Sequence, residues 1–172
     1  LPLSGVRLPD LRGRAFPHAE GATVVVESVL LQLKKDGDIQ LNPLHGRAVD
    51  WHALDSTLRV LTAQNEGAFF LEAHEFLSNE ELFSVSVPLK KNRHARLIPT
   101  TDAVWLLQEK VPIAFRVSLP DGEAALPFTL PFLPTSHDIE SAIPFEEGIA
   151  IPGTQSAQPS LVFFKNGKFE QS

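Results

Sequence analysis

The chain has 172 residues, and its 43% hydrophobic and 21% charged residues are typical of one globular domain or two small ones. The net charge of −6 disfavours a general nucleic-acid binder, because phosphate neutralisation supplies most of that affinity. No apolar run approaches the ~20 residues that a membrane-spanning helix needs, so we expect no membrane span in this chain. The absence of cysteine excludes disulfides, thiolate nucleophiles and cysteine-based zinc sites.

Methionine is also absent, even at position 1. We therefore expect that a signal peptide, an anchor helix or other sequence preceded Leu1. The lack of cysteine does not fix the compartment, since cytosolic and extracytoplasmic proteins can both lack it, and an extracytoplasmic location, periplasmic or secreted, is the favoured interpretation.

The N-terminal third predicts a hairpin. Residues 1–22 carry two Leu-Pro pairs and no sustained period, and we interpret them as an arm that is ordered only against a neighbour. Residues 23–33 are rich in β-branched and apolar residues, which predicts a strand. Asp36-Gly37 then predicts a tight turn, and Ile39 and Leu41 alternate with polar residues on the return strand.

A helix is predicted next, with Asp50 as its N-cap and Asn65-Glu66-Gly67 as its end. Four apolar residues recur at steps of three and four and form one stripe. These residues are Trp51, Leu54, Leu58 and Leu61. Residues 68–73 predict a short buried strand.

The segment after residue 77 supports two interpretations. Ser78 and Glu81 have capping-box spacing, which predicts a second helix through Phe83. Residues 83–87 alternate apolar residues with serine, which is a strand pattern, and Pro88 would break a long helix. A short helix that ends near Val85 is a compromise between the two.

The remaining sequence is strand-like, with eight prolines between Pro112 and Pro159. Strands are predicted at residues 95–98, 103–107, 113–119, 125–133 and 160–164. Asp121-Gly122 and Asn166-Gly167 predict hairpin turns. The predicted fold class is therefore α+β, mainly β-sheet with one or two helices packed on it and a Pro-rich β segment at the C-terminus. The expected parts are an arm (1–22), an α+β core (23–108) and a Pro-rich β extension or second small lobe (109–172).

Metal-binding patterns are weak. None of the six histidines has His-Glu-x-x-His spacing. Glu72 and His74 share a face of a predicted strand, and His52 is a third candidate ligand. A metal needs three or four converging ligands, so a solvated strand end is the favoured interpretation and we predict no metal and no cofactor.

Catalytic patterns are equally weak. No Gly-x-Ser-x-Gly elbow or glycine-rich phosphate loop is present. His137-Asp138 lies in the Pro-rich region, where a surface role is favoured, and Glu80-Glu81 suits a helix N-terminus. Glu146-Glu147 is typical of a solvated loop. We predict no catalytic residue, although a hydrolase with a site dispersed along the chain stays open.

Two features indicate partner binding. Residues 90–96 hold four of the fifteen Lys and Arg residues, which suits an acidic partner, although a solvated turn is favoured. Residues 126–134 form an apolar, Pro-rich edge, which is either covered by residues 1–20 or offered to a partner. The candidate partner-binding residues are Lys90, Lys91, Arg93, Arg96, Phe128, Leu130, Phe132 and Leu133.

Four segments between residues 29 and 99 read VLLQLKKDGDIQLN, AVDWHALDSTLRVLTAQ, GAFFLEAHEFLSNEELF and ARLIP. Their predicted order of hairpin, helix, strand, capped helix and strand resembles the periplasmic domain of the ExbD/TolR family. The resemblance implies a module of a proton-driven energy-transduction complex, anchored upstream. The acidic residue of the anchor helix is not in this chain, and some seventy residues follow where the family usually stops.

These patterns together favour a non-catalytic protein-interaction or structural domain, as part of a larger assembly. A protein partner or self-association as a homo-oligomer is expected, and nucleic acid is not. The ExbD/TolR-like module and the hydrolase with a dispersed site are the two alternatives.

Overall fold

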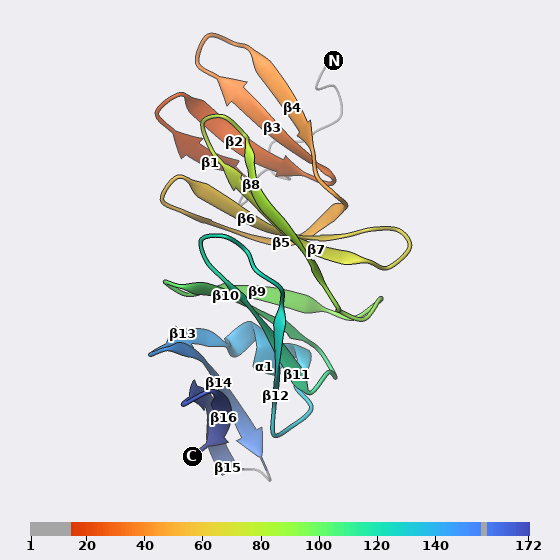
Figure 1. Cartoon of the computed structure of the whole chain (residues 1–172), viewed down its shortest axis with the longest axis vertical. Coiled ribbons are helices and arrows are strands. Elements are labelled where there is room, and N and C mark those ends of the chain that lie inside the picture. Colours follow the sequence, from red (N-terminus) through yellow and green to blue (C-terminus); the bar gives the residue numbers. More distant parts are fainter. Residues whose placement is uncertain (1–14, 156–157) are drawn as a thin grey trace. The chain divides into compact units, whose positions relative to one another are not determined.

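The computed structural model describes residues 15–155 and 158–172, and its regular structure is almost entirely β-strand (Figure 1). The described strands form four antiparallel four-stranded sheets, and within each sheet the strands lie side by side in sequence order. One short helix, α1 (Ser136–Ser141), accompanies them. The α+β prediction, with one or two helices packed on a sheet, is therefore wrong, and the fold is β-rich. No helix in the described part of the chain is long and apolar enough to cross a membrane.

The chain divides into two compact units. An N-terminal unit comprises Leu1–Asn65 and Phe70–Ser84, and a C-terminal unit comprises Glu66–Phe69 and Val85–Ser172. Residues 1–14 of the predicted arm lie outside the described residues, and residues 15–22 belong to the first two strands.

Sheet A of the N-terminal unit consists of β1 (Ala15–His18), β2 (Gly21–Val26), β3 (Val29–Lys34) and β4 (Ile39–Pro43). The predicted strand at 23–33 is thus two strands, because Glu27 adopts a φ of 48° and turns the chain. The predicted turn at Asp36-Gly37 and the return strand at Ile39 are confirmed.

Sheet B consists of β5 (Arg47–Leu54), β6 (Thr57–Ala63), β7 (Phe69–Glu75) and β8 (Glu81–Val87). One apolar cluster joins sheets A and B. Its buried members are Val25, Leu30, Leu44, Leu58, Val60 and Phe76. Two buried polar groups of sheet A also reach the end of β7, because the Thr23 hydroxyl and the Gln32 amide both donate to the Phe76 carbonyl.

The helix predicted from Asp50 is in fact the β5–β6 hairpin. Asp55, with a φ of 54°, turns the chain at its centre. Leu58 and Val60 then lie opposite Ala53 and Trp51, so a period of two builds the buried face. The apolar residues of the predicted stripe lie on two different strands, and their spacing of three and four residues matches a helix only by coincidence.

The second predicted helix is also wrong, and the strand alternative for residues 83–87 is confirmed by β8. The Ser78 amide and hydroxyl both donate to the Glu75 carboxylate, which closes the turn between β7 and β8. Asn79 adopts a φ of 55° within this turn. Ser78, the predicted helix cap, therefore closes a hairpin turn with Glu75, and Glu81 is the first residue of β8.

The C-terminal unit contains sheets C and D. Sheet C consists of β9 (Ala95–Pro99), β10 (Ala103–Gln108), β11 (Ile113–Ser118) and β12 (Leu126–Thr129). Sheet D consists of β13 (Ile143–Phe145), β14 (Gly148–Gln155), β15 (Gln158–Lys165) and β16 (Lys168–Gln171). The predicted strands at 95–98, 103–107, 113–119 and 160–164 are confirmed, whereas the predicted strand 125–133 is a strand only at 126–129, and β13 and β14 were not predicted. The Asn166-Gly167 turn joins β15 to β16 with positive φ at both residues.

Aromatic packing fills the core of this unit. Trp105 on β10 is fully buried, with its ring centroid 4.7 Å from that of Phe164 and 5.5 Å from that of Phe128. The helix α1, which the sequence analysis missed, contributes Ile139 to the same cluster. Its N-cap is Thr135, whose hydroxyl accepts from the Asp138 amide.

Candidate functional site

The outer edge of β4 is a candidate interaction surface. The strand lies at the end of sheet A, and no strand in the described residues pairs with its outer side. Ile39 and Leu41 are 49% and 47% exposed, although both are large apolar residues. Successive residues of a strand point to opposite faces, so these two side chains share one face of the sheet.

Hydrogen-bond parity shows which backbone groups of β4 face outward. The Lys34 amide donates to the Asp38 carbonyl at 2.9 Å, and the Leu44 amide donates to the Ser28 carbonyl at 2.8 Å. Paired and unpaired positions alternate in an antiparallel ladder, so the backbone groups of residues 40 and 42 point toward β3. Those of Ile39 and Leu41 therefore point away from the sheet, together with the carbonyl of residue 43.

The strand β12, which lies within the predicted apolar edge, has fewer outward N–H groups than β4. The Leu130 amide donates to the Pro112 carbonyl, so residues 126 and 128 face β11 and residues 127 and 129 face outward. Residue 127 is proline, which has no N–H to donate. Thr129 thus carries the single outward N–H of this strand.

Side chains of the predicted strip 126–134 divide between core and surface. Leu130 is buried, and Phe128 and Phe132 are partly buried against the Trp105 cluster. Leu133 is 63% exposed, and Leu126 is exposed as well. Two phenylalanines and one leucine proposed for partner binding therefore stabilise the fold.

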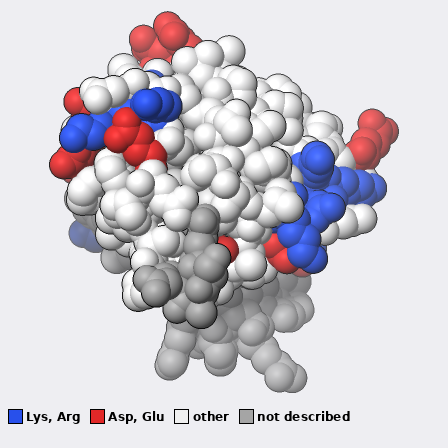
Figure 2. All heavy atoms as spheres, turned by 90° about the horizontal axis from the view of Figure 1, so that it is seen from below, with Lys and Arg blue, Asp and Glu red and all other residues white. Residues whose placement is uncertain are grey.

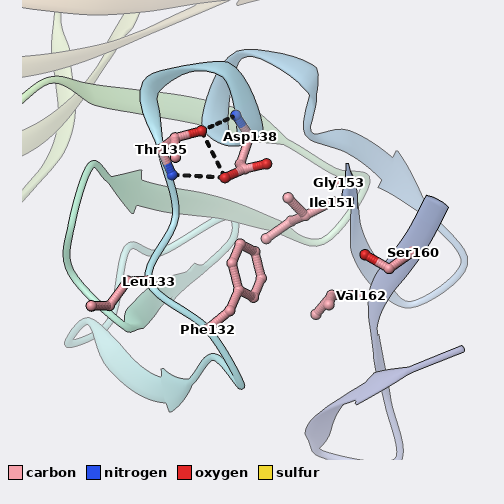
Figure 3. A pocket seen from close by; sticks show the side chains of 8 residues that line it. All are labelled: Phe132, Leu133, Thr135, Asp138, Ile151, Gly153, Ser160 and Val162. Carbon is pink, nitrogen blue, oxygen red and sulfur yellow. Dashed lines mark hydrogen bonds between the residues drawn. The ribbon is translucent and has the colours of Figure 1, made fainter. Parts of the chain in front are cut away.

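Phe132 and Leu133 also border a cavity of about 190 Å³ (Figure 3). The other described residues that line it are Thr135, Asp138, Ile151, Gly153, Ser160 and Val162. Asp138 accepts hydrogen bonds from the Thr135 amide and hydroxyl, both at 2.7 Å, so its carboxylate serves the helix cap. No histidine is among these lining residues, and the one carboxylate among them, that of Asp138, is held by Thr135.

The basic segment 90–96 is held by hydrogen bonds to the buried Gln108 side chain. The Gln108 side-chain amide accepts from the Lys90 amide and donates to the Lys90 carbonyl, which fixes the loop backbone. Lys91 and Arg93 are exposed. Arg96 instead donates to three carbonyl groups at the end of α1, those of Ile139, Glu140 and Ala142, and so acts as a helix C-cap.

Charge is dispersed on the face shown in Figure 2, where acidic and basic side chains form small groups separated by uncharged surface. The described residues of this face present no broad basic area of the kind that follows a nucleic-acid backbone.

A second candidate site is a carboxylate–histidine cluster on sheet B. Glu72 of β7 is fully buried, and its carboxylate accepts from the Thr62 hydroxyl at 2.6 Å and from the His45 amide at 3.1 and 3.2 Å. The His45 ring reaches the Glu81 carboxylate of β8 at 2.9 Å and stacks on Phe70. One ligand atom from each of His45, Glu72 and Glu81 lies within 4.8 Å of the other two.

Part of this cluster is predictable from the sequence. His74 does lie beside Glu72, with its Nε2 3.3 Å from Oε1. His52, the third candidate, lies opposite Arg59 on the β5–β6 hairpin and is not a member. His45 and Glu81 were missed as ligands, because their approach depends on how the loop after β4 meets β7 and β8 rather than on any local spacing.

A glycine positions the loop that carries His45. A Cβ atom at Gly46 would lie 2.6 Å from the Ala63 carbonyl oxygen, closer than any real contact. Only glycine therefore allows the chain to approach β6 and aim the His45 amide at Glu72.

Comparisons with known proteins give no assignment. No family model matches the chain, and no curated protein matches it significantly. The resemblance to the ExbD/TolR family stays an untested prediction, but both helices on which its element order depends are strands in the structure.

Proposed function

We propose that this protein is a non-catalytic interaction module of a larger assembly, and that it accepts an extended segment of a partner at the outer edge of β4. The observation that carries the proposal is the coincidence of outward N–H and C=O groups with two half-exposed apolar side chains at Ile39 and Leu41. In strand addition the backbone groups supply affinity and the alternate side chains supply specificity.

Other edge strands are protected against such pairing. Proline interrupts β1, β12 and β13 at Pro17, Pro127 and Pro144. Charged residues stand on β5, β9 and β16 and at the first residue of β8, and β5 also carries a bulge. Proline, charge and bulges are the devices that discourage edge-to-edge pairing, and among the described edge strands β4 has only a proline at its last residue.

The expected partner follows from this chemistry. It is an uncharged or weakly charged extended segment with apolar residues at alternate positions, since those positions meet Ile39 and Leu41. A second copy of the chain satisfies the same description, so self-association belongs to the same proposal.

Amide hydrogen exchange tests whether the edge is open. In the isolated protein we expect the Ile39 and Leu41 amides to exchange much faster than those of Gln40 and Asn42, whose amides donate to β3. If Ile39 and Leu41 are equally protected in a monomer, the edge is covered by the chain itself and the proposal fails.

A pair of substitutions at one position tests the binding mode. Leu41→Pro removes the outward N–H without disturbing the ladder to β3, whereas Leu41→Thr removes the apolar side chain and keeps the N–H. We expect Leu41→Pro to weaken partner binding by at least about tenfold, through one lost hydrogen bond and the steric bulk of the ring. Leu41→Thr should weaken it less.

The measurement is quantitative affinity capture by the full chain, repeated with both variants after circular dichroism shows that they fold alike. A monomer–dimer titration by sedimentation covers self-association. A partner bound equally by all three proteins would place the interaction surface elsewhere.

A further inference from the structure

The cluster of His45, Glu72 and Glu81 has the composition of a metal-binding site. It combines one imidazole with two carboxylates, which is a donor set that suits zinc and related divalent transition metals. The three groups come from the loop after β4, from β7 and from β8, so a bound ion would cross-link three separate segments of the N-terminal unit.

Glu72 is preorganised as a ligand. Its carboxylate is fully buried, and the Thr62 hydroxyl and the His45 amide fix its orientation. Ligating carboxylates are commonly held by such outer hydrogen bonds, which lower the cost of ordering the ligand when the ion binds.

Among the described residues, the two carboxylates of the cluster have no Lys or Arg partner. Among the described residues, neither Glu72 nor Glu81 has a Lys or Arg nitrogen within 4.0 Å, and their ionic contacts are to histidines. Two carboxylates without a Lys or Arg partner concentrate negative charge, and a buried carboxylate is costly when no cation pairs with it. A divalent cation would balance this charge.

His74 is an independent observation that points to the same place. It is 3% exposed, its Nε2 faces Glu72, and its Nδ1 has no hydrogen-bond partner. Because a carboxylate oxygen accepts, the contact at Nε2 is a hydrogen bond that His74 donates to Glu72. His74 therefore orients Glu72 as an outer hydrogen-bond donor, while its own buried Nδ1 is left without a partner.

We propose that His45, Glu72 and Glu81 bind one divalent transition-metal ion, with Zn²⁺ as the probe. His74 would orient the Glu72 carboxylate through its hydrogen bond to Oε1. Three protein ligands leave at least one position for water or for a donor from a partner. This inference is independent of the β4 edge, because it uses different residues and sheet B.

The chain contains a matched control. His94 and Glu140 form another exposed His–carboxylate pair, but the described residues near it provide no third ligand. A site that needs only a surface pair would bind at both places, whereas the proposed site needs the buried Glu72.

The experiment is isothermal titration of ZnCl₂ into the chelator-treated full chain. We expect one saturable site, a loss of at least about tenfold in affinity for His45→Ala and for Glu81→Gln, and no change for His94→Ala. Both informative substitutions are at partly exposed positions, so folding is preserved, which circular dichroism would verify.

Thermal unfolding gives a second readout. Zinc at about 100 times its Kd should raise the Tm of the wild type by about 5–10 °C and leave that of His45→Ala unchanged. The absence of saturable binding by the wild type, or equal affinity in His45→Ala, would overturn the proposal. An equal loss in His94→Ala would show non-specific surface binding and would also overturn it.

Discussion

His52 is a partly buried polar residue whose surroundings oppose its charged form. Burial lowers its pKa most, and the Arg59 guanidinium lowers it further against a weaker effect of Asp50. Its Nδ1 has no hydrogen-bond partner, and two nitrogen atoms of Arg59 are also unpaired. The β5–β6 hairpin therefore favours the neutral form of the His52 imidazole beside the Arg59 guanidinium.

This lowered pKa predicts a pH-dependent stability. The unfolded chain takes up the proton first as pH falls below the ordinary value of 6.5, so stability is complete above that pH and is lost toward the folded pKa. We expect His52→Gln to lose less stability than the wild type between about pH 7.5 and about pH 5.5. Urea unfolding at both pH values measures this, and an identical pH dependence would contradict it.

Individual elements differ in how well the sequence predicts them. Strands were predicted correctly where a turn residue that accepts positive φ separates them, as at Asp36-Gly37 and Asn166-Gly167. The helix at 50–65 was predicted wrongly because the turn at Asp55 lacks a glycine and the apolar residues of two strands mimic a helical period. The position of β4 at the edge of sheet A could not be predicted, because it depends on the order of the strands in the sheet and not on the local sequence.

The candidate metal site shows the same division. Glu72 and His74 share a face because residues two apart on a strand do so, and the sequence alone predicts that pairing. His45 lies 27 residues from Glu72 and 36 from Glu81, so only tertiary structure brings them together.

Gly21 at the start of β2 and Gly37 in the turn between β3 and β4 both have positive φ, but they differ in the space around them. Gly21 has a φ of 147°, and a Cβ there would lie 1.9 Å from the Leu33 carbonyl oxygen. Gly37 has a φ of 93° and open space around it. We expect Gly21→Ala to cost more than about 3 kcal/mol, since β3 must move, and Gly37→Ala about 1 kcal/mol from backbone strain alone. Urea unfolding by circular dichroism compares them, and equal costs would contradict the clash.

At the scale of the whole molecule, the described residues provide a separate core for each unit. Leu58 belongs to the cluster of sheets A and B, and Trp105 belongs to the cluster of sheets C and D. The chain enters the C-terminal unit briefly at Glu66–Phe69, returns for Phe70–Ser84, and then completes it. Two cores on one continuous chain raise the question of whether they unfold together.

We expect each core to set the local stability of its own unit. Leu58→Ala and Trp105→Ala should cost about 2–5 and about 3–5 kcal/mol, as large-to-small substitutions at fully buried positions. In native-state hydrogen exchange, Leu58→Ala should lower the opening free energy of amides in β3 and β6 and leave those in β14 and β15 unchanged. Trp105→Ala should do the reverse. Substitutions in independent cores do not couple, so each should change only the opening free energies of its own unit. If either substitution lowers the opening free energies of both sets of amides equally, the two units unfold as one cooperative structure.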